Sequence, residues 1–553
     1  MNSINILLRV LIIFCSFLLS SCDRESVVLE EPDNNTDNDD TSYEKFFSSY
    51  IRLNFYETGR VSDESVLAYD DLIMIAFRPY TDGTLFFDLP DNQASFSNAS
   101  YLKDFDNRNG VIDFNGTDAD MNVGFDLLNN VKIAGGSDGS YKQFTFGTWL
   151  SLDNWTPGGF IFKKANESGS VYCKMSDAVG VFEFNINGKS VTIHADNVLN
   201  GWHHFALGYN GNKGTAERVA CYIDGTLLDN VVVASDFPSS VPFIREAFHI
   251  GSGIDAKLDE TFISSLFLPA GTVSGYMNNG IKLRKTDWNS SKTLAYWTYD
   301  NSSDPGKDAQ SWRTIYDELR TTLTGKDIKL RVGMAGGDWK TVVGNATSRT
   351  TFVNSVSDFI SQYAWDGVDL DFEWCESTQE YNNYSKAIVE LGEKLATSDV
   401  TYSVSLHAYY YKISQLAINK TDFISLQVYG PQPSLFDYDE FVSKSNAVVD
   451  YGIPKEKLVL GVPFYGVESN GNRSSAAYLN FVDAGLISSP LQDQVTYNGK
   501  TYTFDGQETI RKKALFAKQN KYKGIMSWDI ATDVTYSNEL SLAKAVNDVL
   551  AFE

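Results

Sequence analysis

Three acidic side chains follow one another at every second position in the segment YAWDGVDLDFEW at 363–374. They are Asp369, Asp371 and Glu373, with apolar residues between them. In a β-strand, successive side chains point to opposite faces, so this spacing places the three acids on one face. Crowded carboxylates raise the pKa of at least one of them toward neutral pH. The segment is therefore a candidate for general acid–base chemistry.

The residues around these acids separate two interpretations of the segment. An exposed edge strand would tolerate three carboxylates without any function. The flanking residues Trp365, Val368, Leu370, Phe372 and Trp374 are all large and apolar. They indicate a buried strand, in which three acids on one face have no structural reason to be present.

With Asp366, the acids form the pattern DxxDxDxE, which resembles the signature of glycoside hydrolase family 18, a family of chitinases and endo-β-N-acetylglucosaminidases. Further segments resemble strands of that family's barrel in the expected order. They are KLRVGMAGG (329–337), TYSVSLH (401–407), FISLQVY (423–429), LVLGVPFYG (458–466) and GIMSWD (524–529). Two positions depart from the family's pattern, because Met334 replaces a serine and Gly430 stands where an acid or amide is common.

The resemblance implies a retaining mechanism in which the substrate's own 2-acetamido oxygen attacks the anomeric carbon. It assigns Glu373 as the acid that protonates the leaving oxygen, and Asp371 as the group that holds the acetamide N–H. Asp369 would share a proton or hydrogen bond with Asp371, Asp366 would order the entry of the strand, and Tyr429 would hydrogen-bond the acetamide carbonyl. The side chains expected to bind the sugar are Trp528, Gln427, Phe77 and Tyr465.

A (β/α)₈ barrel needs eight parallel strands, and the family-like segments supply six. Directly before the amphipathic helix expected at 311–324 there is one candidate, at 294–299. Two better candidates lie far upstream, YIRLNFY at 50–56 and DLIMIAF at 71–77. The sequence therefore predicts an α/β fold, a TIM barrel interrupted after strand two by an all-β jelly-roll sandwich. The predicted segments are the first two barrel strands at 43–92, the insert at 93–300, and the six remaining, catalytic barrel strands at 301–553.

The predicted insert contains short β-runs separated by turn signals, which are typical of an antiparallel sandwich. The runs are at 144–152, 181–186, 191–195, 204–210 and 219–224. The motifs GWHH (201–204), YIDG (222–225) and IGSG (250–253) resemble laminin-G-like (concanavalin-like) domains. We expect no cofactor, with a structural Ca²⁺ in the insert left open, and we expect His203 and His204 to pack in a sheet. Pairing of Cys173 with Cys221 stays open, as does the insert's role as a wall of the cleft or a spacer.

The first residues resemble a bacterial lipoprotein signal. Arg9 precedes an apolar run at 10–19, too short to span a bilayer, which ends in Leu-Ser-Ser-Cys22. We expect a signal peptide at 1–22, lipid attachment at Cys22, and an acidic tether at 23–42. This predicts an exported, lipid-anchored outer-membrane or cell-surface protein that contacts the membrane only through its lipid.

The composition agrees with a carbohydrate ligand. Lys and Arg number 46 against 71 Asp and Glu, giving a net charge of −25, which disfavours nucleic acid. Aromatic residues make up 14% of the chain, suited to stacking on sugars or to large β-rich cores. We expect a glycosidase that cleaves β-1,4 bonds next to N-acetylglucosamine, in chitin or the chitobiose core of N-glycans. The alternative is a non-catalytic glycan-binding protein on the same barrel.

The short segment before the helix expected at 508–518 predicts that an extra α+β lobe is absent or reduced.

Overall fold

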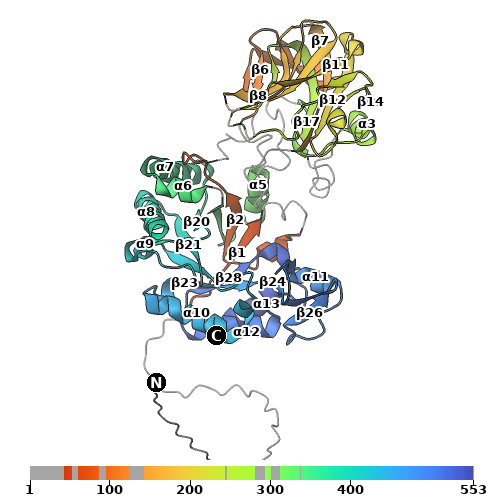
Figure 1. Cartoon of the computed structure of the whole chain (residues 1–553). Coiled ribbons are helices and arrows are strands. Elements are labelled where there is room, and N and C mark those ends of the chain that lie inside the picture. The colour runs from red at the N-terminus through yellow and green to blue at the C-terminus, as the bar shows by residue number, and fades with distance from the viewer. Residues whose placement is uncertain are drawn as a thin grey trace, which may run out of the picture. The chain divides into compact units, whose positions relative to one another are not determined.

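A closed barrel of eight parallel strands forms the larger part of the protein. The computed structural model describes residues 43–52, 60–85, 95–124, 142–167, 169–242, 244, 246–280, 293–300, 312–336 and 338–551. The barrel strands run in the order β1-β2-β19-β20-β21-β22-β23-β28, and β28 also pairs with β1 (Figure 1). Their bounds are β1 Phe47–Arg52, β2 Asp71–Phe77, β19 Lys329–Ala335, β20 Gly367–Asp371, β21 Thr401–His407, β22 Phe423–Gln427, β23 Leu458–Pro463 and β28 Gly524–Trp528. The predicted TIM barrel is confirmed.

The barrel is interrupted in sequence after its second strand. β2 pairs in parallel with β19, with Asp71 opposite Lys329 and Ile73 opposite Arg331. Two antiparallel sheets lie between these strands in the sequence. The remaining candidate, 294–299, corresponds to β18 (Thr293–Trp297), which pairs with β17 (Asp255–Ser264) of the insert and is not a barrel strand. The predicted interruption of the barrel by an all-β sandwich is confirmed.

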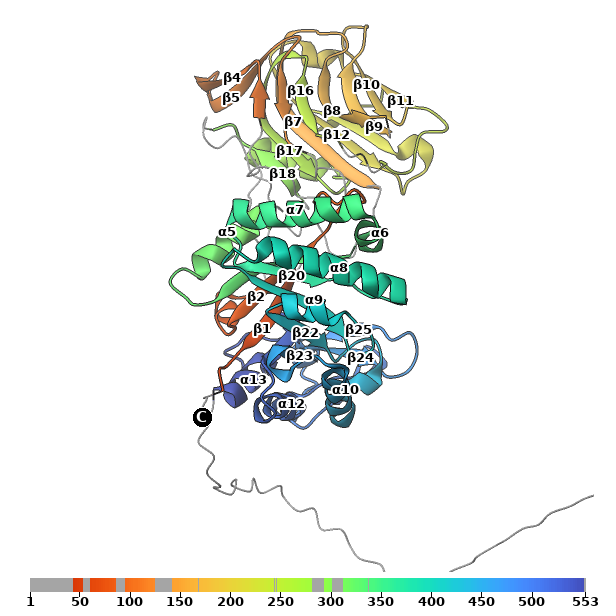
Figure 2. The ribbon, with the colours of Figure 1, turned by 90° about the vertical axis from the view of Figure 1, so that its left-hand side faces the viewer.

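Helices surround the barrel strands, and Figure 2 shows α7 and α8 side by side. The helix α8 shows how such a helix packs on the strands. Its buried residues recur three or four positions apart and form one apolar face, and they are Tyr384, Ile388, Leu391 and Leu395. The hydroxyl of Tyr384 also donates to the carbonyl of Leu370 on β20 at 2.9 Å. The helix bounds are α2 Asp63–Val66, α5 Trp312–Thr322, α6 Trp339–Gly344, α7 Ala346–Tyr363, α8 Thr378–Leu395, α9 Gln415–Lys420, α10 Tyr438–Tyr451, α12 Gln507–Gln519 and α13 Leu542–Leu550. None of the helices in the described ranges has the length and apolar character needed to cross a bilayer.

Two sheets form the inserted sandwich. Their orders are β15-β11-β10-β9-β8-β16-β6-β3 and β14-β13-β12-β7-β17-β5-β4, with β18 beside β17. The bounds are β3 Ser95–Ser97, β4 Ala99–Phe105, β5 Arg108–Asn115, β6 Asp120–Asn122, β7 Gln143–Asn154, β8 Phe160–Asn166, β9 Gly169–Met175, β10 Val181–Ile186, β11 Lys189–His194, β12 Trp202–Asn210, β13 Val219–Ile223, β14 Thr226–Leu227, β15 Val231–Val233 and β16 His249–Ser252, with the helix α3 Ala270–Asn279. Apolar side chains from both sheets, including Phe144, Phe162 and Phe184, fill the space between them.

Two histidines and two cysteines of the insert have defined surroundings within the sandwich. His204 is 2% exposed and contacts the rings of Trp149 and Phe262, while His203 pairs with Asp224 at 2.8 Å. Cys173 and Cys221 are free thiols in the same buried cluster. Within the part of the chain that the structure describes, no three His, Cys, Asp or Glu side chains gather as a metal site.

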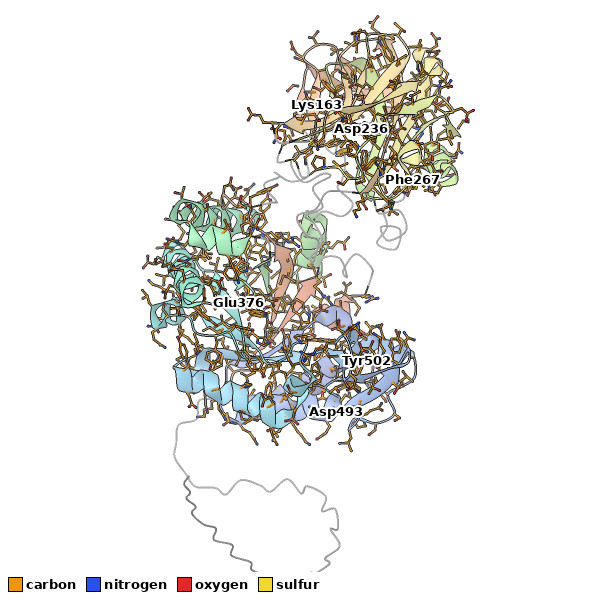
Figure 3. The ribbon with its side chains drawn as sticks, viewed as in Figure 1. Lys163, Asp236, Phe267, Glu376, Asp493 and Tyr502 are labelled. Atoms are coloured by element: carbon orange, nitrogen blue, oxygen red, sulfur yellow. The ribbon has the colours of Figure 1, made fainter. Side chains whose placement is uncertain are left out.

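A small lobe follows β23, where the sequence predicted an absent or reduced one. It is a four-stranded antiparallel sheet in the order β25-β24-β27-β26, together with a helix of six residues, α11. Figure 3 labels Tyr502 on β27, which contacts Phe481 of α11. The bounds are β24 Tyr465–Glu468, β25 Ser475–Ala477, α11 Tyr478–Asp483, β26 Gln494–Tyr497 and β27 Lys500–Thr503. A lobe of four strands and one helix is therefore present.

The predicted signal peptide, Cys22 and the acidic tether lie in 1–42, outside the described residues.

Candidate active site

A cavity of about 520 Å³ opens where the barrel strands end. Its lining includes Glu373 and Trp374 after β20, His407 at the end of β21, and Trp528 at the end of β28. The strands of a parallel barrel all end at one face, so residues far apart in sequence meet there. The other lining residues used below are Arg52, Arg60, Gln427, Tyr429, Tyr465, Arg473, Ser475 and Asn480.

Asp369 lies beneath the cavity, fully buried and surrounded by hydroxyl donors. Its carboxylate accepts hydrogen bonds from Ser403 at 2.5 Å, Ser405 at 3.0 Å and Tyr50 at 3.0 Å. Ser403 and Ser405 point inward from β21, and Tyr50 comes from β1 on another side of the barrel. Burial raises the pKa of Asp369, whereas Arg331 and these hydroxyls act to lower it.

Arg331 is a fully buried guanidinium in the barrel interior. It forms a bidentate pair with Asp71, at 2.6 Å from Nε and 2.7 Å from Nη2. Its Nη1 donates to the Ser403 hydroxyl at 2.6 Å, and that hydroxyl donates to Asp369. A buried charge requires a partner and satisfied hydrogen bonds, and Arg331 has both. Arg331 is thus connected to Asp369 through one serine.

Asp371 and Glu373 continue toward the cavity from the same strand. Asp371 is 2% exposed and accepts a hydrogen bond from the Gln427 amide at 2.9 Å. Burial, followed by the charges of Glu373 and Asp369, raises the pKa of Asp371 well above its ordinary value. Glu373 lies two residues beyond the end of β20 and reaches solvent in the cavity. The protein around it still excludes water and raises the pKa of Glu373 to about 6.

These shifts distribute protons among the three acids. Burial, and then the charges of Glu373 and Asp369, raise the pKa of Asp371 and favour its protonated form, while the hydrogen bond from the Gln427 amide acts in the opposite direction. Asp369 has four groups that favour its ionised form. Glu373 changes its protonation near pH 6, where a side chain can both donate and accept a proton. The geometry can therefore perform general acid–base chemistry at Glu373.

Aromatic side chains form the surroundings of the acids. Tyr429 is 4% exposed and belongs to the apolar cluster that includes Tyr50, Tyr465 and Trp528. The ring of Trp528 lies 5.0 Å from that of Tyr50, centroid to centroid. Arg52 lies over Trp528 at 5.5 Å and pairs with the buried Asp529. Trp528 therefore lines the cavity with its ring in contact with Tyr50 and Arg52.

The structure brings together seven of the eight side chains that the sequence predicted for catalysis and sugar binding. Glu373, Gln427, Tyr429, Tyr465 and Trp528 line the cavity, and Asp369 and Asp371 lie below it. Phe77 does not join them. It is fully buried and contacts Phe359 of α7 and Trp365, at 5.7 and 5.8 Å between ring centroids. Phe77 therefore packs between the barrel and its helices. The prediction that it contacts the sugar is wrong.

Alternation along β2 explains this difference. Period two puts Phe77 on the same face as Ile73 and Ile75, which do point into the barrel. Ala76 also belongs to the interior cluster, so the alternation breaks after Ile75. The pairing of β2 with its neighbour β19 also shifts register just before Phe77, between Val332 and Met334. Phe77 consequently faces the helices.

The two departures from the family pattern have different consequences. Met334 is fully buried, and the hydroxyls on Asp369 come from β1 and β21 instead. At Gly430, a Cβ atom would approach His407 Nε2 to 3.2 Å, and His407 Nε2 hydrogen-bonds the carbonyl of Tyr429. Neither Met334 nor Gly430 displaces an acid, since Asp369, Asp371 and Glu373 all occupy the site.

Several residues of the site escaped the sequence analysis, namely Tyr50, Arg331, Ser403, Ser405, His407 and Arg52. Ser403 and Ser405 carry a detectable signal, since they alternate with Tyr402, Val404 and Leu406 in the strand TYSVSLH. Asp366, which the sequence analysis did single out, lies just before β20 and contacts two other segments. It accepts from the Leu330 backbone N–H at 2.7 Å and pairs with Arg320 at 2.6 Å.

Residues 276–533 match the model of the family described as "Glycosyl hydrolases family 18". Residues 128–274 match that of the "Concanavalin A-like lectin/glucanases superfamily". The first match includes six of the barrel strands and leaves out β1 and β2, which the structure supplies from 47–77.

Curated relatives each align with less than half of this chain. A class V chitinase of Arabidopsis thaliana is 24% identical over 265 residues, 37% of this chain and 70% of that protein. Probable chitinase 2 of Drosophila melanogaster is 25% identical over 39% of this chain and 59% of its own length. The solved GH18 chitinase ChiB from the chitin utilization locus of Flavobacterium johnsoniae is 27% identical, with a TM-score of 0.37 over 43% of this chain and 79% of that chain.

Proposed function

We propose that this chain, whose barrel is a chitinase-like family 18 glycosidase domain joined to a concanavalin A-like domain, hydrolyses β-1,4 bonds next to N-acetylglucosamine. The observation that carries the proposal is the position of Glu373. It faces the cavity with a pKa raised to about 6, directly above the buried Asp371 and the Gln427 amide. A carboxylic acid in that state can protonate a leaving glycosidic oxygen near neutral pH.

The nucleophile in this proposal is the substrate's acetamide oxygen. Asp369, Asp371 and Glu373 come from one segment, β20 and the residues just after it. A retaining mechanism with a protein nucleophile needs two carboxyl groups about 5–5.5 Å apart on opposite sides of the anomeric carbon. One strand cannot readily place its side chains on both sides. The acetamide of the sugar can approach from the side that the protein leaves free.

Asp371 and Tyr429 would orient the acetamide group. The Asp371 carboxyl accepts its N–H, while the Tyr429 hydroxyl donates to its carbonyl oxygen. Burial raises the pKa of Tyr429 well above its ordinary value, so the hydroxyl keeps the proton that it donates. As positive charge develops on the oxazolinium ion, the proton of Asp371 moves toward Asp369 and leaves a compensating negative charge on Asp371. Glu373 then activates water from the same side, which retains the anomeric configuration.

The sugar itself would stack on Trp528. Its ring lines the cavity and is held by Tyr50 and Arg52. Apolar faces of pyranose rings pack well on such surfaces. Gln427 and Tyr465 line the same region, so a sugar at this place has polar partners around its edge. Chitin and the chitobiose core of N-glycans both present the required N-acetylglucosamine.

A substrate panel tests the proposal. The purified protein is incubated with chitin oligosaccharides, with a high-mannose glycoprotein and with fully de-N-acetylated chitosan oligosaccharides, and products are separated by mass. We expect cleavage of at least one acetylated substrate and none of chitosan, because chitosan lacks the nucleophile. Equal cleavage of chitosan would contradict the acetamide mechanism. Binding of acetylated substrates without any product would favour the non-catalytic alternative.

We also propose that the protein is exported and held at the cell surface by a lipid on Cys22. The apolar run at 10–19, followed by Leu-Ser-Ser-Cys22 and an acidic segment, supports this location.

A further inference from the structure

The cavity is lined by more basic side chains than acidic ones, although the chain as a whole is acidic. Arg52, Arg60 and Arg473 line it, and Glu373 is the one acidic side chain among the described lining residues. The net charge of the entire sequence is −25. Local side chains dominate the potential inside a cleft with low-dielectric walls, so a ligand there meets these arginines first.

Arg52 and Arg473 differ in the partners that their guanidinium groups have within the protein. Arg52 pairs with the buried Asp529 and lies over Trp528, so its charge is compensated within the protein. Arg473 has a different environment. It lies in the turn between β24 and β25 of the small lobe, exposed to solvent, and among the described residues it makes no hydrogen bond or ion pair.

The one carboxylate of the β24–β25 hairpin already has other partners. Glu468, at the end of β24, accepts from Lys500 at 3.1 Å and from the Ser474 hydroxyl at 2.8 Å. Lys500 also donates to Ser474 at 3.0 Å, which closes a compact polar triangle. Lys500 thus compensates the charge of this carboxylate, and Arg473 has no ion-pair partner among the described residues.

Arg473 has an unusual backbone conformation, and two neutral polar side chains of the small lobe line the cavity with it. Its φ is +54°, in the left-handed region that non-glycine residues rarely adopt. The pairing of Val467 with Ser475 fixes the strand that follows. Ser475, from this strand, and Asn480, from α11, line the same cavity as Arg473. The small lobe thus contributes a guanidinium, a hydroxyl and an amide to the lining of the cavity.

Resting on the proposed glycosidase function, we propose that Arg473 is a specificity-determining residue that binds the carboxylate of an acidic sugar adjacent to N-acetylglucosamine. A guanidinium matches a carboxylate with two parallel hydrogen bonds, which a neutral hydroxyl of chitin cannot reproduce. Ser475 and Asn480 would bind hydroxyl or amide groups of the same sugar. The carboxylate can belong to a uronic acid or to the lactyl ether of a muramic acid, and both present the same chemistry to Arg473.

The test measures binding to full-length protein with the Glu373→Gln substitution, which prevents turnover. The probes are tetra-N-acetylchitotetraose, a GlcNAc–glucuronate tetrasaccharide and a GlcNAc–muramate tetrasaccharide, studied by calorimetry at low and high salt. We expect at least one acidic probe to bind about tenfold more tightly than chitotetraose, because a charge-assisted bidentate pair is stronger than a hydrogen bond between neutral groups. This preference should weaken at high salt, because Arg473 is exposed.

Two added substitutions assign the preference to one side chain. Arg473→Gln should remove it while leaving the affinity for chitotetraose within about twofold. Lys512→Gln, which removes one exposed charge from α12, should leave it intact. A preference that persists in Arg473→Gln, or the lack of any preference for an acidic probe, would overturn this inference alone. Failure to bind any probe, chitotetraose included, would instead contradict the proposed function and the inference with it.

Discussion

The Ser403 hydroxyl lies 2.5 Å from the Asp369 carboxylate and donates its proton to it, while accepting from Arg331 at 2.6 Å. Ser403 thereby links a fully buried arginine on β19 to the innermost acid of the catalytic strand. A hydrogen bond donated to a carboxylate favours its ionised form. The serine on β21 thus influences which of the neighbouring acids carries the proton.

Removal of this hydroxyl should shift the pH profile. In Ser403→Ala, the pKa of Asp369 rises, Asp369 takes a larger share of the proton, and negative charge moves onto Asp371. That charge lies next to Glu373 and raises its pKa, so the alkaline limb of kcat/KM moves to higher pH. Ser425→Ala is the matched control, because the Ser425 hydroxyl is buried on β22 without a partner among the described residues. A profile of Ser403→Ala identical to that of the control would contradict the link.

The unmodified enzyme should lose activity as the pH rises above about 6, since Glu373 must be protonated to act as the acid. Its pKa is raised relative to a free glutamate, so the active protonated form is present below this pH and disappears above it. The kcat/KM of a soluble fluorogenic chitobioside, measured from pH 4 to 9, should fall about tenfold per unit on the alkaline side. A flat profile up to pH 9 would show that Glu373 is not the acid in the rate-limiting step.

The substitution Glu373→Gln should lower kcat by roughly 10²–10⁴-fold, the usual share of a general acid. Binding of chitin oligosaccharides should change little, because the amide retains the shape of the carboxyl group. Glu376→Gln is the control, since Glu376 is largely exposed and pairs with Lys340 on the surface. Near-normal hydrolysis by Glu373→Gln would assign the acid to another residue.

A fragment of residues 301–553 should not fold on its own. It lacks β1 and β2, whose neighbours β28 and β19 would become open edges prone to aggregation. Replacement of the insert by a short Gly/Ser joiner between 92 and 301 should instead give a soluble barrel. Thermal unfolding followed by circular dichroism distinguishes the two proteins, and cooperative unfolding of the 301–553 fragment would refute the split barrel as a folding unit.

Cys22→Ala should release the protein from the membrane fraction, because the proposal assigns the attachment to a lipid on this cysteine. Cys15→Ala, within the leader, should leave the protein in that fraction. Immunoblots of fractionated cells after a salt wash provide the measurement. A Cys22→Ala variant that stays with the membrane would point to another attachment.

Local patterns in the sequence determined which residues could act together on one strand. Alternation alone places Asp369 and Asp371 on one face, since side chains in a strand have a period of two whatever the rest of the fold does. The mostly apolar runs of the barrel strands likewise predicted the architecture and its interruption, because strands buried on both faces read as continuous apolar segments.

Only the tertiary structure decided what surrounds those acids. Tyr50, Arg331 and Ser403 contact Asp369 or its network from three different strands, and closure of the barrel brings them together. A period-two pattern contains no information about partners on other strands. Phe77 was predicted to belong to the site, and the structure places it elsewhere. The segment DLIMIAF is almost wholly apolar, so its sequence does not show that the alternation breaks beside a register shift. Contacts between side chains of different strands therefore determine the hydrogen-bond partners of Asp369. The register shift between β2 and β19 accompanies the exclusion of Phe77 from the site.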